Sequence, residues 1–146
     1  MFDALIRRLT APAPDRLPEP EADLALAALL VRIARADGHY AEAEIDRIDK
    51  VLIARHGLSP FEAAKLRREA EAFEAEAPDT VRFTRALKDA VAVDDRASVM
   101  QALWAVALAD GGRDDEEDQV LRLVSNLLGL TDQESALARQ RAERRD

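Results

Sequence analysis

The chain has 146 residues, a length that suits one compact domain with a single core. Its 29 acidic and 21 basic residues give a net charge of −8, which opposes nucleic-acid binding and favours cations or basic protein surfaces. There is no cysteine, which excludes disulfides, thiolate zinc sites and thiol catalysis and fits a cytoplasmic location.

The composition favours helices over a sheet. Leucine and alanine dominate, whereas only five glycines and six aromatic residues are present. The longest uninterrupted apolar runs, residues 24–31 and 102–109, are far shorter than the roughly 18 to 20 residues needed to span a bilayer. We therefore expect an all-α fold in a single compact domain, without a transmembrane segment.

Residues 1–20 are predicted to form a short amphipathic helix and a proline-rich connector. Apolar residues recur at helical spacing at Phe2, Leu5, Ile6 and Leu9, and prolines follow at positions 12, 14, 18 and 20. We interpret this helix as one that folds back onto the helical domain, residues 21–146. The alternative is a docking tail for a partner or a membrane surface, although so short a helix offers little apolar area for binding alone.

The first half of the domain is predicted to contain three helices. The first, residues 20–36, is apolar on nearly every side, which is typical of a central helix. A second helix covers residues 41–56 and ends at Gly57. Ser59 and Pro60 open a third, to about residue 75, whose expected inner contacts are Phe61, Ala64, Leu66 and Phe73.

The second half is predicted to begin with a short helix over residues 78–90. An apolar helix, capped by Asp94 or Asp95 and carrying Trp104 in the core, runs to residue 109. Residues 115–128 form the next helix, and Thr131 caps a last one over residues 132–143. The total is about seven to eight helices.

Two short acidic turns are the strongest internal signal. Ala36-Asp37-Gly38 is followed by Glu44, and the same arrangement returns 73 residues later as Ala109-Asp110-Gly111 with Glu117. Each copy follows an apolar run and precedes an amphipathic helix. This indicates an internal pseudo-two-fold repeat of helix-turn-helix units.

Helix geometry alone accounts for part of each turn. A glycine directly after a helix is the usual left-handed terminal residue, and Asp114 with Glu117 has the spacing of a capping box. In the first copy Ala41 replaces the capping residue, yet Glu44 is still present. We infer that something other than reciprocal capping keeps the acidic residues together there.

Carboxylates at a helix junction also suit a hard divalent cation such as Ca²⁺, Mg²⁺ or Mn²⁺. An EF-hand is excluded because its first two ligand positions would fall on Ile33 and Arg35, or on Val106 and Leu108. The candidate metal ligands are Asp37, Glu44, Asp110, Glu117 and Asp114. The second turn is the stronger candidate, because residues 110–118 carry a net charge of −5.

The paired acidic turns, their helical context and the sequence Leu127-Leu128-Gly129-Leu130 after the second copy resemble the TerB-like family, named for a tellurite-resistance protein. The resemblance covers roughly residues 21–130. It implies an all-helical fold with internal pseudo-symmetry, metal binding by the acidic turns, and a sensing or adaptor role in membrane-linked stress systems. By position, the metal proposal falls on Asp37, Glu44, Asp110 and Glu117, and Ala41 departs from the residue type common in the first turn.

The leading hypothesis is a non-enzymatic stress-response adaptor or sensor that binds a divalent cation, a protein partner or both through its acidic turns. One alternative is a metal-dependent hydrolase, which requires the four carboxylates to converge on one dinuclear site that activates water. Another is a protein-interaction module in which the acidic turns are purely structural. No catalytic residue and no nucleic-acid partner is predicted.

Overall fold

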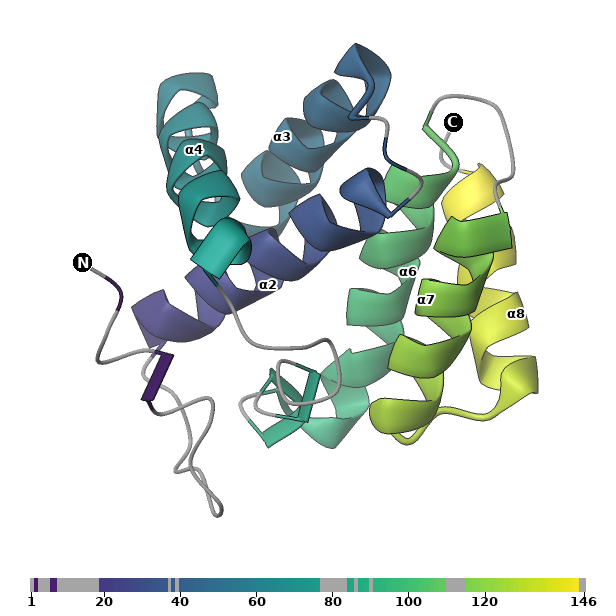
Figure 1. Ribbon diagram of the computed structural model, residues 1–146. Helices are drawn as coiled ribbons and strands as arrows, with labels where there is room; N and C mark the ends of the chain where they lie inside the picture. The colour runs from purple at the N-terminus through teal and green to yellow at the C-terminus, as the bar shows by residue number, and fades with distance from the viewer. Residues whose placement is uncertain are drawn as a thin grey trace.

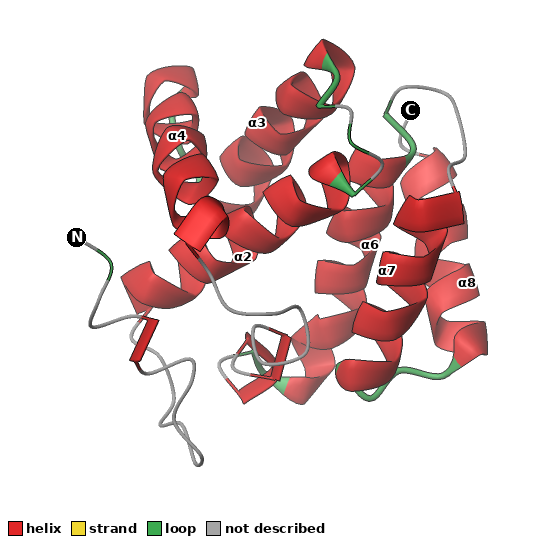
Figure 2. Cartoon of the chain, in the orientation of Figure 1, coloured by secondary structure: helices red, strands yellow, loops and turns green. Residues whose placement is uncertain are grey.

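The computed structural model describes residues 2, 6–7, 19–36, 38, 40–76, 84–85, 87–89, 91–109 and 115–144. The regular elements within these ranges are all helical, as Figure 2 shows. The predicted all-α fold class is confirmed.

The described helices fall into two groups of three. The first group is α2 (Glu19–Arg35), α3 (Glu42–His56) and α4 (Pro60–Glu76), and the second is α6 (Arg96–Ala107), α7 (Asp115–Leu127) and α8 (Asp132–Arg144). Residues 84–85 and 87–89 are also helical, and a 3-10 turn, η1 (Val93–Asp95), leads into α6. The predicted bounds of these six long helices differ from the observed ones by one or two residues at most.

The two groups share one packing plan. The closest helix pairs are α2 with α4 and α6 with α8, which occupy corresponding places in the two groups. Helix α2 runs diagonally through the middle of the molecule, where it contacts α3 and α4 on one side and α6 and α7 on the other (Figure 1). The internal repeat therefore comprises three helices in each copy, one more than the acidic turns alone indicated.

The core is built around α2, as its sequence predicted. Residues 25–31 of this helix are all buried, because alanine and leucine on every side let neighbouring helices approach closely. Trp104 of α6 is also buried, and its indole Nε1 donates a hydrogen bond to Ser135 Oγ of α8 at 3.2 Å. This bond satisfies the one polar group that the indole brings into the core.

Helix α4 buries part of the face that was predicted, since Phe73 is buried and Leu66 is partly buried as expected. Phe61 is 74% exposed, so its expected inner position is wrong. The buried residues are Ala63, Ala70 and Phe73, which lie on one stripe at helical spacing. Phe61 lies two residues before Ala63, on nearly the opposite side of the helix, and the small side chains of the stripe allow close packing against α2.

The start of the chain packs onto this core. The ring of Phe2 lies 5.3 Å from that of Phe73, at 53°, and Ile6 is partly buried against the same cluster. These contacts agree with a segment that folds back onto the domain. The proline-rich connector lies outside the described residues. None of the described helices is both long and apolar enough to cross a membrane.

Capping boxes open α4 and α8 at positions 72 residues apart. The backbone N–H of Ser59 donates to Glu62 Oε1 at 2.9 Å, and that of Glu62 donates to Ser59 Oγ at 3.1 Å. Thr131 and Glu134 form the same reciprocal pair at 2.9 and 3.0 Å. The bonds from Ser59, its backbone N–H first, hold the pKa of Glu62 below its usual value. This cap therefore stabilises the fold above about pH 4.5 and loses its effect as the pH falls below that.

At α6 the expected cap is not formed. Asp95 occupies the N-cap position, but its side chain makes no capping hydrogen bond. Its carboxylate instead pairs with the guanidinium of Arg55 on α3 at 2.6 Å. The ion pair links the two halves of the molecule, and the 3-10 turn supplies the start of the helix.

Gly57 ends α3 in the left-handed region, at φ +66°, as predicted. An added Cβ there would meet no atom within 4 Å, so backbone strain is the sole direct cost of a side chain. We expect Gly57→Ala to lower the free energy of unfolding by about 1 kcal/mol, and Gly57→Asn by less, because asparagine tolerates this conformation. Urea unfolding monitored by circular dichroism measures both, and equal losses would contradict this explanation.

Candidate functional site

The predicted metal ligands are only partly covered by the structure. Asp37, Asp110 and Asp114 lie outside the described residues. Glu117 lies in the first turn of α7, and its side chain is outside the described part of the molecule. Glu44 is the predicted ligand whose side chain is described. The cation site formed by these five residues therefore stays a prediction.

The ends of the helices that flank both turns lie at the same end of the molecule. Figure 1 shows the C-terminal ends of α2 and α6 and the N-terminal ends of α3 and α7 in the upper half of the view. Gly38 has φ +82°, the left-handed conformation predicted for a helix stop, and its N–H donates to the carbonyl of Arg35 at 3.0 Å. Its counterpart Gly111 lies outside the described residues.

Glu44 is fully buried, which is unusual for a carboxylate. Its Oε1 accepts a hydrogen bond from the backbone N–H of Ala41 at 3.2 Å, which is half of a capping box. Alanine has no acceptor for the other half, and the N–H of Glu44 bonds the carbonyl of Ala41 at 3.0 Å instead. Capping at the first turn is therefore one-sided, as the missing acceptor at Ala41 predicted, and it binds one carboxylate oxygen of Glu44. What keeps Asp37 and Glu44 together stays a prediction, because Asp37 lies outside the described residues.

The residue before the first turn is fixed to α4. Arg35 Nη1 lies 2.9 Å from Glu74 Oε2, and Arg32 Nε lies 3.2 Å from Glu74 Oε1. Arg32 Nη2 also donates to the carbonyl oxygen of Glu74 at 3.4 Å. The carboxylate of Glu74 is largely buried, so these contacts are screened less by water than a surface pair would be. One glutamate thereby holds the end of α2.

The residue after the turn is fixed to the same helix. The hydroxyl of Tyr40 donates to Glu71 Oε2 at 2.7 Å, and the guanidinium of Arg35 lies 4.9 Å from the centre of the Tyr40 ring. Glu71 also accepts from Arg67 at 3.2 Å, and Arg67 pairs with Asp49 of α3 at 2.7 Å. The side chains of Arg35 and Tyr40 therefore attach both sides of the first turn to α4, in an arrangement that we call the turn frame.

The second turn lacks the residues for such a frame. At the 73-residue offset, Leu108 replaces Arg35 and Arg113 replaces Tyr40. The two turns thus differ in these flanking residues as well as in charge. Sequence reasoning missed the turn frame, because its partners lie 31 to 42 residues apart and no local pattern connects them.

The turn frame gives Tyr40 a distinctive titration. Burial, together with the hydrogen bond to Glu71 and the negative charge of that residue, raises the pKa of Tyr40 well above its usual 10.0. The unfolded chain loses this proton near pH 10, whereas the folded protein keeps it to higher pH. The contribution of Tyr40 to stability is therefore complete below pH 10 and is lost as the pH rises further.

Tyr40 is the only tyrosine, so tyrosinate absorbance reports this residue alone. We expect the absorbance to rise at a higher pH in the native protein than in urea. The difference in free energy of unfolding between the wild type and Tyr40→Phe should also shrink as the pH rises above about 10. A native midpoint equal to that in urea would contradict the hydrogen bond to Glu71.

The described residues contain no group of three or more His, Asp or Glu side chains that could hold a metal ion. The chemistry that they do offer lies beside the first turn, where Arg35 and Tyr40 are tied to α4 and the carboxylate of Glu44 is buried.

Comparison with known proteins gives one match. The family model described as tellurite resistance protein TerB matches residues 23–140, which is most of the chain. No curated protein and no solved structure matches the chain. The matched region extends beyond the stretch that carried the resemblance, to include most of α8.

Proposed function

Because the chain belongs to the TerB family of tellurite resistance proteins, we propose that it is a non-enzymatic adaptor or sensor domain of a stress response. Its acidic turns bind a divalent cation, a basic surface of a partner protein, or both. The cation is a hard ion such as Ca²⁺, Mg²⁺ or Mn²⁺, because the candidate ligands are carboxylates. No chemical step is assigned to the domain.

The observation that carries this proposal is the turn frame. A binding loop that is rigid before its ligand arrives loses less conformational entropy on binding. Arg35 and Tyr40 bracket Asp37 in sequence, and both are tied to α4 through Glu74 and Glu71. Such anchoring exceeds what a helix stop needs, since Gly57 ends α3 with a backbone hydrogen bond and a left-handed conformation.

The proposal is tested by titrating the metal-free protein with Ca²⁺, Mg²⁺, Mn²⁺ and Zn²⁺ while backbone amide shifts are followed. We expect shifts confined to residues 37–44 and 110–117 at up to about 10 mM ion. Asp110→Asn should abolish the response of the second turn, and Asp37→Asn that of the first. The matched control is Asp46→Asn, an exposed carboxylate on α3.

A basic oligolysine peptide tests the second part of the proposal in the same way. Amide shifts with the peptide and none with ions would support the partner role and refute the cation role. No shift at either turn with any probe would refute both, and the turns would then be purely structural, as the half capping box of Glu44 already is.

A further inference from the structure

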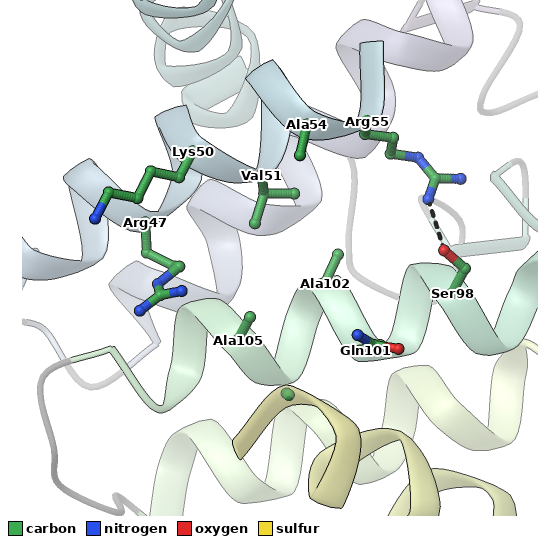
Figure 3. Close-up of a pocket in the computed structure, with 10 residues that line it drawn as sticks. Arg47, Lys50, Val51, Ala54, Arg55, Ser98, Gln101, Ala102 and Ala105 are labelled. Carbon is green, nitrogen blue, oxygen red and sulfur yellow. Dashed lines mark hydrogen bonds between the residues drawn. The ribbon is translucent and has the colours of Figure 1, made fainter. Parts of the chain in front are cut away.

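A groove lies between α3 and α6, and none of the predicted cation ligands is among the residues that line it. It has a volume of about 410 Å³ and is lined by residues of α3, α6 and α8. Figure 3 shows Val51 and Ala54 of α3 facing Ala102 and Ala105 of α6 across it. Ala142 of α8 completes the lining. A floor of such small side chains lets a bound backbone approach closely.

The charge of the groove is opposite to that of the chain. Three basic residues of α3 line it, Arg47, Lys50 and Arg55, and its described lining includes no acidic residue. Arg55 closes one end, where it pairs with Asp95 and donates to Ser98 Oγ at 3.1 Å. Figure 3 places Arg47 toward the other end, beside Ala105. Lys50, which is exposed, follows Arg47 by three residues on α3. In a protein of net charge −8, this is a local basic surface.

The floor of the groove is specific to one half of the repeat. At the 73-residue offset, Ala102 corresponds to Leu29 and Ala105 to Arg32. Leu29 is fully buried, and Arg32 reaches across to Glu74 on α4. Protein interiors are close-packed, so alanine at both positions of α6 leaves space that the larger side chains of α2 would fill.

The rim differs in the same way. Arg47 and Lys50 correspond to Val120 and Leu123 of α7, and Arg55, two residues before Gly57, corresponds to Leu127, two residues before Gly129. Leu127 is partly buried, whereas Arg55 reaches across to α6 at the edge of the groove. Small residues in the floor and cations on the rim therefore occur together. The other half has larger residues at the floor positions and apolar residues at the rim positions.

We propose that this groove binds an acidic amphipathic helix of a partner protein. The occupant lies along α3 with alanine and leucine toward the alanine floor. Two carboxylates, three or four residues apart on one face of that helix, meet Arg47 and Lys50, which are themselves three residues apart. From Arg47 to Arg55 the rim rises about 12 Å, or roughly two helical turns, which suits a short helical segment.

A helix fits these features better than a small anion does. A phosphate or a single carboxylate would use the cations and leave the apolar floor uncovered, whereas an amphipathic helix covers both surfaces at once. The groove is also independent of the acidic turns, because its lining includes none of the predicted cation ligands.

The probe is a helix-stapled peptide of about 15 residues, in which two glutamates four residues apart share a face with alanine and leucine. Titrated into the full chain, it should shift the amides of residues 47–55 and 98–105, and raising NaCl from about 20 to about 300 mM should weaken binding. The same peptide with glutamine for glutamate should bind at least about tenfold more weakly.

Two variants separate this proposal from nonspecific attraction. Ala102→Leu fills the floor with the residue found at Leu29 in the other half, and it should abolish binding while the protein stays folded. Lys50→Glu reverses the rim charge and should weaken binding about tenfold or more. Lys65→Glu is the matched control, since it makes the same change at an exposed position of α4 and should leave affinity unchanged.

Several results would overturn the proposal. These are shifts spread over the whole surface, equal binding of the glutamine peptide, or full affinity in Ala102→Leu. Inorganic phosphate that competes fully with the peptide would assign the groove to a small anion instead. Self-association in sedimentation experiments, abolished by Ala102→Leu, would assign it to a second copy of the chain. Neither result bears on the cation titration, so the two proposals can fail separately.

Discussion

Leu29→Ala is expected to lower the free energy of unfolding by about 2–5 kcal/mol. Leu29 lies on α2 and is fully buried, and removal of its side chain loses both the transfer free energy and the contacts around the resulting cavity. Because α2 contacts helices of both groups, the loss should appear as one cooperative shift in urea unfolding, seen equally by circular dichroism and by Trp104 fluorescence.

The matched control is Leu123→Ala, the same chemical change on α7 at a side chain that is 40% exposed. It should cost clearly less, because much of this leucine already contacts water. Equal losses for the two substitutions would show that α2 is not the centre of the core. Separate transitions for circular dichroism and fluorescence would show that the two groups of helices unfold independently.

Glu74→Gln is expected to loosen the first acidic turn and to lower the free energy of unfolding by about 1–3 kcal/mol. The glutamine cannot pair with the charges of Arg32 and Arg35, which lie 3.2 and 2.9 Å from the carboxylate. The exposure of Arg35 places the loss below that for a fully buried pair. Hydrogen exchange of the amides of Gly38 and Tyr40 should become faster, whereas that of α8 should change little.

Glu76→Gln provides the control, because it neutralises an exposed glutamate two residues further along the same helix. It should leave both stability and the exchange rates near the turn unchanged within about 0.5 kcal/mol. If Glu74→Gln behaved like this control, the ion pairs would not hold the turn, and the turn frame would lose its support as a preorganised site.

The helices could be predicted from the sequence because their signals are local. Ser59 with Glu62, and Thr131 with Glu134, are three residues apart, and Gly57 marks an end by its own conformation. The apolar character of residues 25–31 likewise predicts burial without knowledge of any partner. Interactions that close within one helical turn can be recognised from their spacing alone.

The turn frame and the buried face of α4 could not be predicted in this way. Both depend on how α4 is rotated against α2, and the sequence of α4 offered Phe61 as a plausible inner residue. Tertiary packing exposed Phe61 and buried Ala63 and Ala70 beside the predicted Phe73. This rotation also points Glu71 and Glu74 toward Tyr40 and Arg35. A contact between residues some 40 positions apart follows from that rotation and not from any spacing.

The groove is an intermediate case. Its signal was present in the sequence, as alanine at 102 and 105 against Leu29 and Arg32 in the other copy. This signal can be recognised only when the two copies are aligned over whole helices and not at the acidic turns alone. An alignment over whole helices also reveals a shared sequence, Gly-Leu-Ser/Thr-x-x-Glu, which begins at Gly57 and again at Gly129.

The central position of α2 also bears on how the protein is made. Helix α2 contacts α6 and α7, yet it leaves the ribosome before either of them. The end of α6 is 72 residues beyond the end of α2, which at ordinary rates of synthesis takes about 4 to 14 seconds. During that interval the surface of α2 that α6 and α7 later cover is open to other chains, so the nascent first half is the stage at which aggregation competes with folding.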